Sequence, residues 1–206
     1  MDNSEHMFTL LYLHGLNSSP NSKKARLTKD WFAQRVPAVD FLCPAIPPFA
    51  HAAMDMLENE IALIEGRTVH LVGSSMGGFF ATCLIEKYDL RGVLINPAVD
   101  PANGMEYLLG KHKNFQGTDF WTLEPRHVEE YRDNAHEKIK NKSNYIVLLQ
   151  TGDEVLSYVG GKVSPEMEIP KILWLKRNLK QQYDKIAYFF DLADFLVYKS
   201  TGKNIR

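Results

Sequence analysis

Residues 69–78 read VHLVGSSMGG, and this stretch decides the fold expected for the chain. An apolar run ends at Gly73 and an apolar helical run begins at Met76, so the pattern is strand, sharp turn, helix. Gly73, Ser75 and Gly77 form a Gly-x-Ser-x-Gly motif, whose glycines allow a turn that larger side chains would block. Such a turn exposes the serine at a helix N-terminus, where free N–H groups favour a developing oxyanion. The motif therefore predicts Ser75 as a catalytic nucleophile.

Two other interpretations of this motif remain open from the residues alone. A Gly/Ser turn could begin a helix without taking part in any chemistry. A phosphate-binding loop has less support, because the sequence contains neither G-x-G-x-x-G nor G-x-x-x-x-G-K-[ST]. The apolar strand before the motif and the apolar helix after it favour the nucleophile.

Outward from the motif, short apolar runs alternate with segments of helical period. The runs are rich in Val, Ile and Leu and are punctuated by Gly, Pro or Asn, which is typical of buried strands. Strands are expected at residues 8–13, 40–43, 68–72, 92–95, 145–149 and 172–175. Helices are expected at residues 25–34, 51–65, 76–88, 126–142 and 182–198. This alternation predicts one α/β domain over residues 1–206, with three layers and helices on both faces of a mostly parallel sheet.

Two segments carry more specific expectations. In the helix at 25–34, Leu27 and Trp31 recur at i and i+4 and predict the apolar stripe, which Ala25, Thr28 and Phe32 flank. The stretch at 97–124 has no clear period and is rich in methionine and aromatic residues, which predicts an irregular lid or pocket wall. Its apolar side chains could equally line an acyl pocket or belong to ordinary core.

Composition excludes several classes of function. With 24 Lys+Arg against 25 Asp+Glu, the chain has no overall charge that would attract nucleic acid or anionic lipid. No apolar run reaches the roughly 18 residues of a membrane span, and the polar N-terminus does not resemble a signal peptide. Cys43 and Cys83 are too few for a disulfide framework or a cysteine-rich zinc site, and we expect reduced core thiols. We therefore expect a cytoplasmic protein with no metal, no organic cofactor, and no nucleic-acid or membrane partner.

Two further segments could complete a serine hydrolase site. His14-Gly15-Leu16 follows the first expected strand, where an early loop can supply a second oxyanion donor. The N–H groups of Leu16 and Met76 are the predicted oxyanion hole for an acyl group on Ser75. Asp153 follows the fifth expected strand and comes after the serine, as the acid of a catalytic triad would. On its own, Asp153 could equally cap the turn that follows it.

Taken together, these segments resemble the YqiA-like esterases, a small bacterial branch of the α/β-hydrolases. The matching stretches are LLYLHGLNSSPNSKKA (10–25), VGSSMGGFFAT (72–82), INPAV (95–99), LEPRHV (123–128) and QTGDEVLSY (150–158). The resemblance implies a single α/β-hydrolase domain that hydrolyses esters or thioesters of short to medium acyl chains. By motif, it assigns the nucleophile to Ser75 and the acid to Asp153, and it implies no cofactor.

One part of the chain departs from the family pattern. The resemblance implies a catalytic histidine near the C-terminus, but no histidine follows Asp153, and Leu179 occupies the expected position. The base could be lost, which would leave a weakened hydrolase that binds an acyl ligand or a partner protein. A substitute base could be His127 or His136, although their polar helix favours solvated side chains. Finally, the tail at 159–181 could reflect an altered sequence, such as a compensated frameshift.

Overall fold

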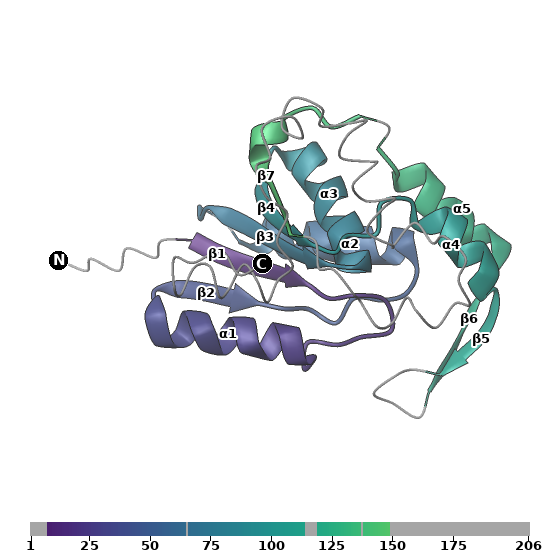
Figure 1. Cartoon of the computed structure of the whole chain (residues 1–206), viewed down its shortest axis with the longest axis horizontal. Helices are drawn as coiled ribbons and strands as arrows, with labels where there is room; N and C mark the ends of the chain where they lie inside the picture. Colours follow the sequence, from purple (N-terminus) through teal and green to yellow (C-terminus); the bar gives the residue numbers. More distant parts are fainter. Residues whose placement is uncertain (1–7, 65, 114–118, 137, 149–206) are drawn as a thin grey trace, which may run out of the picture.

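The computed structural model describes residues 8–64, 66–113, 119–136 and 138–148. Its main sheet has five parallel strands in the order β2-β1-β3-β4-β7 (Figure 1). The strands are β1 (Phe8–Leu13), β2 (Val39–Leu42), β3 (Val69–Ser74), β4 (Arg91–Ile95) and β7 (Tyr145–Leu148). The parallel α/β architecture and the first five predicted strands are thereby confirmed. The predicted strand at 172–175 and the predicted helix at 182–198 lie outside the described residues.

Helices lie on both faces of this sheet, as the alternating pattern predicts. α1 (Lys23–Arg35) covers one face, and α2 (Ala50–Leu63) and α3 (Met76–Tyr88) cover the other (Figure 1). α5 (Pro125–Asn134) packs against α2. Three layers are expected when helices in the crossover connections between parallel strands pack on both faces of the sheet.

Alternation of side chains along the strands divides the core into two parts. Leu11 and Leu71 are fully buried against α2 and α3 on one face of the sheet. Leu10, Tyr12 and Val72 belong to a second buried cluster on the face covered by α1. Because successive strand residues point to opposite faces, a strand buried on both sides must be apolar at nearly every position.

α3 is buried over most of its length and carries much of the first core cluster. Its buried residues are Met76, Gly77, Gly78, Phe79, Phe80, Ala81, Cys83, Leu84, Ile85 and Glu86. A helix that is apolar on nearly every side can pack against both the sheet and α2 without exposing hydrophobic surface. Since α3 begins directly after Ser75, its packing also fixes the position of the predicted nucleophile.

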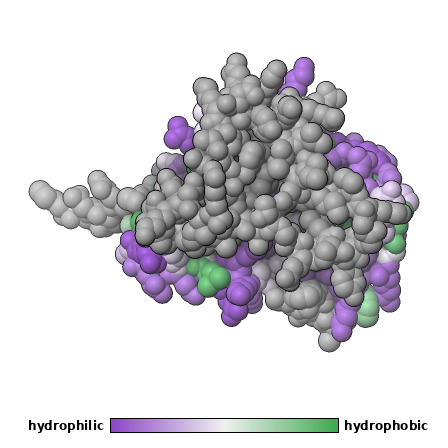
Figure 2. Space-filling model, in the orientation of Figure 1, coloured by the Kyte–Doolittle hydropathy of each residue, from purple (hydrophilic) through white to green (hydrophobic). Residues whose placement is uncertain are grey.

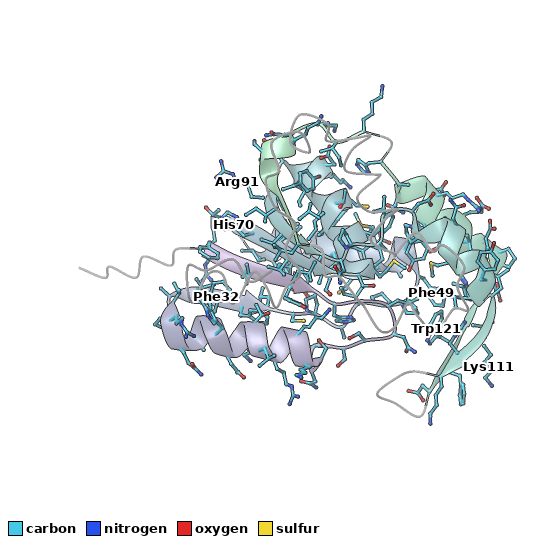
Figure 3. The ribbon with its side chains drawn as sticks, in the orientation of Figure 1. Phe32, Phe49, His70, Arg91, Lys111 and Trp121 are labelled. Carbon is cyan, nitrogen blue, oxygen red and sulfur yellow. The ribbon has the colours of Figure 1, made fainter. Side chains whose placement is uncertain are left out.

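The predicted apolar stripe of α1 is wrong, although the helix itself is present. Leu27 is 59% exposed and Trp31 is 46% exposed, and the outer side of α1 is mainly hydrophilic (Figure 2). The buried side instead carries Ala25, which lets the helix approach the sheet closely, and Phe32, which points toward it (Figure 3). The Phe32 ring packs edge-on against Phe8, with centroids 6.4 Å apart. Packing against the sheet, rather than helical period alone, selects the buried side.

The described residues of the stretch at 97–124 are largely regular, which corrects the expectation from its lack of period. They form α4 (Pro101–Met105), a 3-10 helix (Glu106–Leu108) and an antiparallel hairpin of β5 (Gly110–Lys113) and β6 (Phe120–Leu123). The hairpin extends away from the main sheet (Figure 1). Elements of three to five residues are too short to show a period of their own. A role as lid or pocket wall stays a prediction.

The helix predicted at 126–142 is shorter than its polar pattern suggests. α5 ends at Asn134, and Ala135 has extended backbone angles. A 3-10 helix (Lys142–Asn144) then leads into β7. Polar residues without apolar spacing do not mark where a helix ends, so the sequence could not place this boundary.

Both cysteines are free, as expected, and burial controls their reactivity. It raises the pKa of the half-buried Cys43 to about 11 and that of the buried Cys83 to about 12. The thiolate is the reactive form, so at about pH 8 we expect disulfide reagents to react about 100-fold and about 1,000-fold more slowly, respectively, than with unfolded chain. Labelling with Ellman's reagent, with and without denaturant, checks this, and Cys43→Ser and Cys83→Ser assign the two rates. Rapid labelling of Cys83 in the folded protein would contradict it.

Candidate active site at the β3–α3 corner

Ser75 occupies a strained corner between β3 and α3. Its φ of 55° and ψ of −120° are angles that residues other than glycine seldom adopt. The Ser75 N–H donates to Ile95 O at 3.0 Å, and Ser75 O accepts from the N–H groups of Gly78 at 2.8 Å and Ala98 at 2.9 Å. The residue is half-buried. The backbone is therefore held firmly while part of the residue stays accessible to solvent.

The glycines around Ser75 are required by close approaches of backbone. A Cβ on Gly73 would lie 2.4 Å from Gly77 O, and a Cβ on Gly77 would lie 2.0 Å from Leu13 O of β1. A Cβ on Gly78 would lie 2.6 Å from Pro97 Cβ. No side chain fits at such distances, so the Gly-x-Ser-x-Gly stretch forms the strand–turn–helix corner that it predicts.

The loop after β1 lies against Ser75. A Cβ on Gly15 would be 3.3 Å from Ser75 Cβ and 3.7 Å from Ser75 Oγ, so the loop backbone passes close to this side chain. β1 and β3 are neighbours in the sheet, but α1 and α3 leave them toward opposite faces (Figure 1). In parallel α/β sheets, ligands bind beyond the carboxyl ends of two such strands. Ser75 therefore lies where this topology places binding sites.

His14 joins the loop after β1 to the loop before α2. The residue is 3% exposed; its Nε2 lies 3.0 Å from Ile46 N, and its Nδ1 lies 2.9 Å from Gly15 O. Because Ile46 N–H can only donate, Nε2 accepts, and the neutral ring donates its Nδ1 proton to Gly15 O. Burial lowers the pKa of His14, and the bond to Gly15 opposes part of that effect. The imidazole is therefore neutral at physiological pH.

The structure brings together two of the segments expected to form the site. Leu16 and Met76, the predicted oxyanion donors, come directly after Gly15 and Ser75, which lie close together here. Met76 is buried and is the first residue of α3, whereas Leu16 is half-buried. Asp153 and Leu179 lie outside the described residues. The roles of Leu16, Met76 and Asp153 in catalysis stay predictions.

The two candidate substitute bases have other partners in the structure. His127 is not solvated, as its polar helix suggested, but is 8% exposed, because its Nδ1 accepts the Glu124 N–H at 3.0 Å and caps α5. Its ring packs on Phe49 with centroids 4.1 Å apart, and Phe49 in turn packs edge-on against Trp121 of β6 (Figure 3). His136 is exposed as expected, and its Nδ1 lies 3.1 Å from the oxygen of the nearby Asn134 carbonyl.

Two backbone N–H groups at the site were not predicted. Ile46 donates to His14, and Ala98 donates to Ser75 O. Ala98 lies in the INPAV stretch, which the resemblance already singled out, so that motif is the signal for its contact. Ile46 lies in the proline-rich stretch at 44–49, where proline restricts the backbone and can hold an N–H in one direction.

Two kinds of feature are absent from the described part of the chain. Within it, no group of three or more His, Cys, Asp or Glu side chains is arranged to hold a metal ion. Among the helices of the same residues, none is long and apolar enough to cross a membrane.

Comparison with known families decides how this chain is related to others. The family described as "Uncharacterised protein family (UPF0227)" matches residues 9–174. The chain belongs to this family. Membership confirms the resemblance to YqiA-like proteins drawn from the motifs around Ser75 and Asp153. The UPF0227 match ends before Leu179, the position at which a histidine was expected.

Several solved structures are similar in fold to this UPF0227 chain. A putative hydrolase from Agrobacterium vitis S4 has a TM-score of 0.57 at 20% identity, covering 71% of this chain and 69% of that chain. Mouse alpha/beta hydrolase domain-containing protein 10 has a TM-score of 0.55 at 14% identity, covering 86% and 90%. Est1E from Butyrivibrio proteoclasticus, bound to ferulic acid, has a TM-score of 0.52 at 11% identity, covering 71% and 69%. At these identities the likeness shows the α/β-hydrolase fold.

The same chain also matches curated carbohydrate kinases. D-ribulokinase YDR109C of Saccharomyces cerevisiae is 55% identical over 56 residues, which are 27% of this chain and 8% of that protein. The FGGY carbohydrate kinase domain-containing protein of Xenopus laevis is 32% identical over 158 residues, which are 74% of this chain and 28% of that protein. The UPF0227 chain thus spans less than a third of the length of these kinases.

Proposed function

We propose that this α/β-hydrolase-like protein hydrolyses esters or thioesters of short to medium acyl chains, with Ser75 as the nucleophile. The observation that carries the proposal is the strained Ser75 corner, held by three backbone hydrogen bonds and lying close to the loop after β1. A serine held this way needs no rearrangement before it attacks. The UPF0227 match and the α/β-hydrolase neighbours support the same class of reaction.

The proposed reaction passes through an acyl-enzyme. Ser75 Oγ attacks the acyl carbonyl carbon and gives up its proton, and the carbonyl oxygen becomes an oxyanion that the N–H groups of Leu16 and Met76 stabilise. The intermediate collapses when the bond to the alcohol or thiol breaks and the leaving group takes up a proton. Water then hydrolyses the acyl-enzyme by the same steps and frees the acid. Asp153 would orient whichever base accepts the proton.

The identity of that base sets the expected rate. No histidine follows Asp153, and His127 already uses its Nδ1 to cap α5. In serine hydrolases, loss of the histidine costs about 10⁶ in turnover, whereas the oxyanion hole and binding still leave about 10³–10⁴ over water. We therefore expect slow hydrolysis that depends on Ser75.

A second candidate function is acyl-ligand or partner binding without turnover. It is favoured by the missing histidine. We do not propose sugar phosphorylation, because the longer of the two kinase matches covers only 28% of the kinase.

The test compares the purified chain with its Ser75→Ala variant. We expect p-nitrophenyl butyrate hydrolysis by the parent chain to exceed that of Ser75→Ala at least about 10-fold, since removal of the nucleophile leaves only background. Mass spectrometry after treatment with an alkyl fluorophosphonate should find the label on Ser75. Ser143→Ala, which alters an exposed serine in the turn before β7, is the matched control and should behave as the parent chain. Equal rates for parent and Ser75→Ala, with no label, would favour the binding function instead.

A further inference from the structure

His14 lies beside the proposed site but has no part in the reaction described above. The geometry points to His14 as a positioning residue: it fixes the Gly15–Leu16 peptide, so that the Leu16 N–H is already oriented when an oxyanion forms on Ser75. This inference deepens the proposed function and rests on it. It concerns the direction of one peptide group.

The carbonyl of Gly15 is held by two donors. His14 Nδ1–H lies 2.9 Å from it and Ser18 N–H lies 3.2 Å from it. The peptide bond is planar, and none of the described peptide bonds is cis. In a trans peptide the N–H points away from the carbonyl, so a fixed Gly15 carbonyl also fixes the direction of the Leu16 N–H. Donors that need no reorientation stabilise an oxyanion most effectively.

His14 can act in this way because its own ring is anchored. Ile46 N–H donates to Nε2, and two residues later Pro48 O accepts from the hydroxyl of Tyr131 at 2.8 Å. Tyr131 lies on α5 and is fully buried. Hydrogen bonds therefore connect the buried side of α5, the loop before α2 and the ring of His14 with the carbonyl of Gly15.

The same contacts argue against His14 as the missing base. Its Nε2 accepts from Ile46 N–H and its Nδ1 donates to Gly15 O, so neither ring nitrogen is free to accept a proton from Ser75. Burial further disfavours the charged ring that a base would become. His14 therefore holds the loop and does not exchange protons.

Two substitutions separate the two hydrogen bonds of the ring. In His14→Asn, the side-chain amide can take the place of Nδ1 and donate to Gly15 O, while the contact to Ile46 is lost. In His14→Gln, the longer side chain can take the place of Nε2 and accept from Ile46, while the bond to Gly15 O is lost. Each variant thus keeps one bond, which makes them matched controls for each other.

The experiment measures the rate of Ser75 labelling by the alkyl fluorophosphonate at several reagent concentrations. We expect His14→Gln to lower the maximum rate about 100-fold with little change in the half-saturating concentration, as loss of an oxyanion donor does. His14→Asn should lose less than about 10-fold. A merely structural role would lower the melting temperature of both variants and leave their labelling rates similar. Labelling rates that do not separate the two variants would overturn the inference.

A second measurement keeps this inference distinct from the proposed function. If the parent chain is not labelled at Ser75, the proposed function fails. Histidine ring ¹⁵N spectroscopy then decides whether His14 holds the loop: we expect a neutral ring protonated on Nδ1 at neutral pH, and loss of that signal in both variants. A ring protonated on Nε2, or a charged ring, would overturn the assignment independently of activity.

Discussion

Gly77→Ala is expected to destabilise the protein by about 3 kcal/mol or more. The added Cβ would lie 2.0 Å from the carbonyl oxygen of Leu13 and 2.4 Å from its carbonyl carbon. Both atoms belong to the backbone of a central strand and cannot rotate away as a side chain could. α3 would have to shift outward and break its packing with the sheet. Small domains are stable by only about 5–15 kcal/mol, so this is a large share of the total.

The measurement is urea-induced unfolding followed by circular dichroism, with Gly104→Ala as the control. Gly104 lies in α4, has no neighbour within 4 Å of an added Cβ, and is not at positive φ. Alanine there should change the free energy of unfolding by less than about 1 kcal/mol. Failure of Gly77→Ala to fold at all would agree with the prediction. A loss below about 1 kcal/mol would show that the helix can move at little cost.

Glu86→Ala is expected to cost about 2–4 kcal/mol in the free energy of unfolding. Glu86 is on α3 and is 6% exposed, and its carboxylate accepts from the Tyr145 hydroxyl and from the Lys140 N–H at 2.9 Å. Alanine would leave the half-buried Tyr145 hydroxyl and the Lys140 N–H without this acceptor. Because Tyr145 begins β7, the variant would also loosen the strand at that end of the described sheet.

Further variants test whether the contact between Glu86 and Tyr145 explains the loss of stability. Glu86→Gln keeps the size and one acceptor and should cost less than Glu86→Ala, and Tyr145→Phe removes the hydroxyl donor alone. A double-mutant cycle between Glu86 and Tyr145 then gives their coupling. Glu58→Ala is the surface control, because Glu58 pairs with the exposed Lys87, and it should have little effect. Equal losses for Glu58→Ala and Glu86→Ala would contradict the prediction.

The pH dependence of stability follows from the same contact. Burial first, and then the hydrogen bond to Glu86, raise the pKa of Tyr145 above its ordinary value near 10. An acid whose pKa is raised by folding contributes stability below its unfolded pKa and loses it above. The Tyr145 contribution is therefore complete at neutral pH and falls as the pH rises above about 10.

The sequence predicts the parts of this molecule that depend on backbone geometry alone. Gly73 and Gly77 predict the corner, because only glycine fits where other backbone atoms come so close. The strands are predicted equally well, because burial on both faces demands apolar residues at nearly every position. The corner at Ser75 could therefore be predicted from the order of apolar and small residues along the chain alone.

The errors arise where tertiary contacts override local pattern. Leu27 and Trp31 of α1 are exposed, whereas Ala25 and Phe32 pack against the sheet. His127 looked solvated on a polar helix, but its ring packs on Phe49, which precedes α2, and is buried. Neither outcome is visible without the neighbouring element.

The bonds that hold Ser75 also determine how the site takes part in local opening. The Ser75 N–H donates to the carbonyl of the last residue of β4. The Ser75 carbonyl accepts from the N–H groups of Gly78 in α3 and Ala98 beyond β4. Breaking any of these hydrogen bonds would disturb β3, β4 or the buried helix α3. The corner should therefore belong to the last cooperative unit to open, and the amide protons of Ser75 and Ala98 should exchange only with global unfolding.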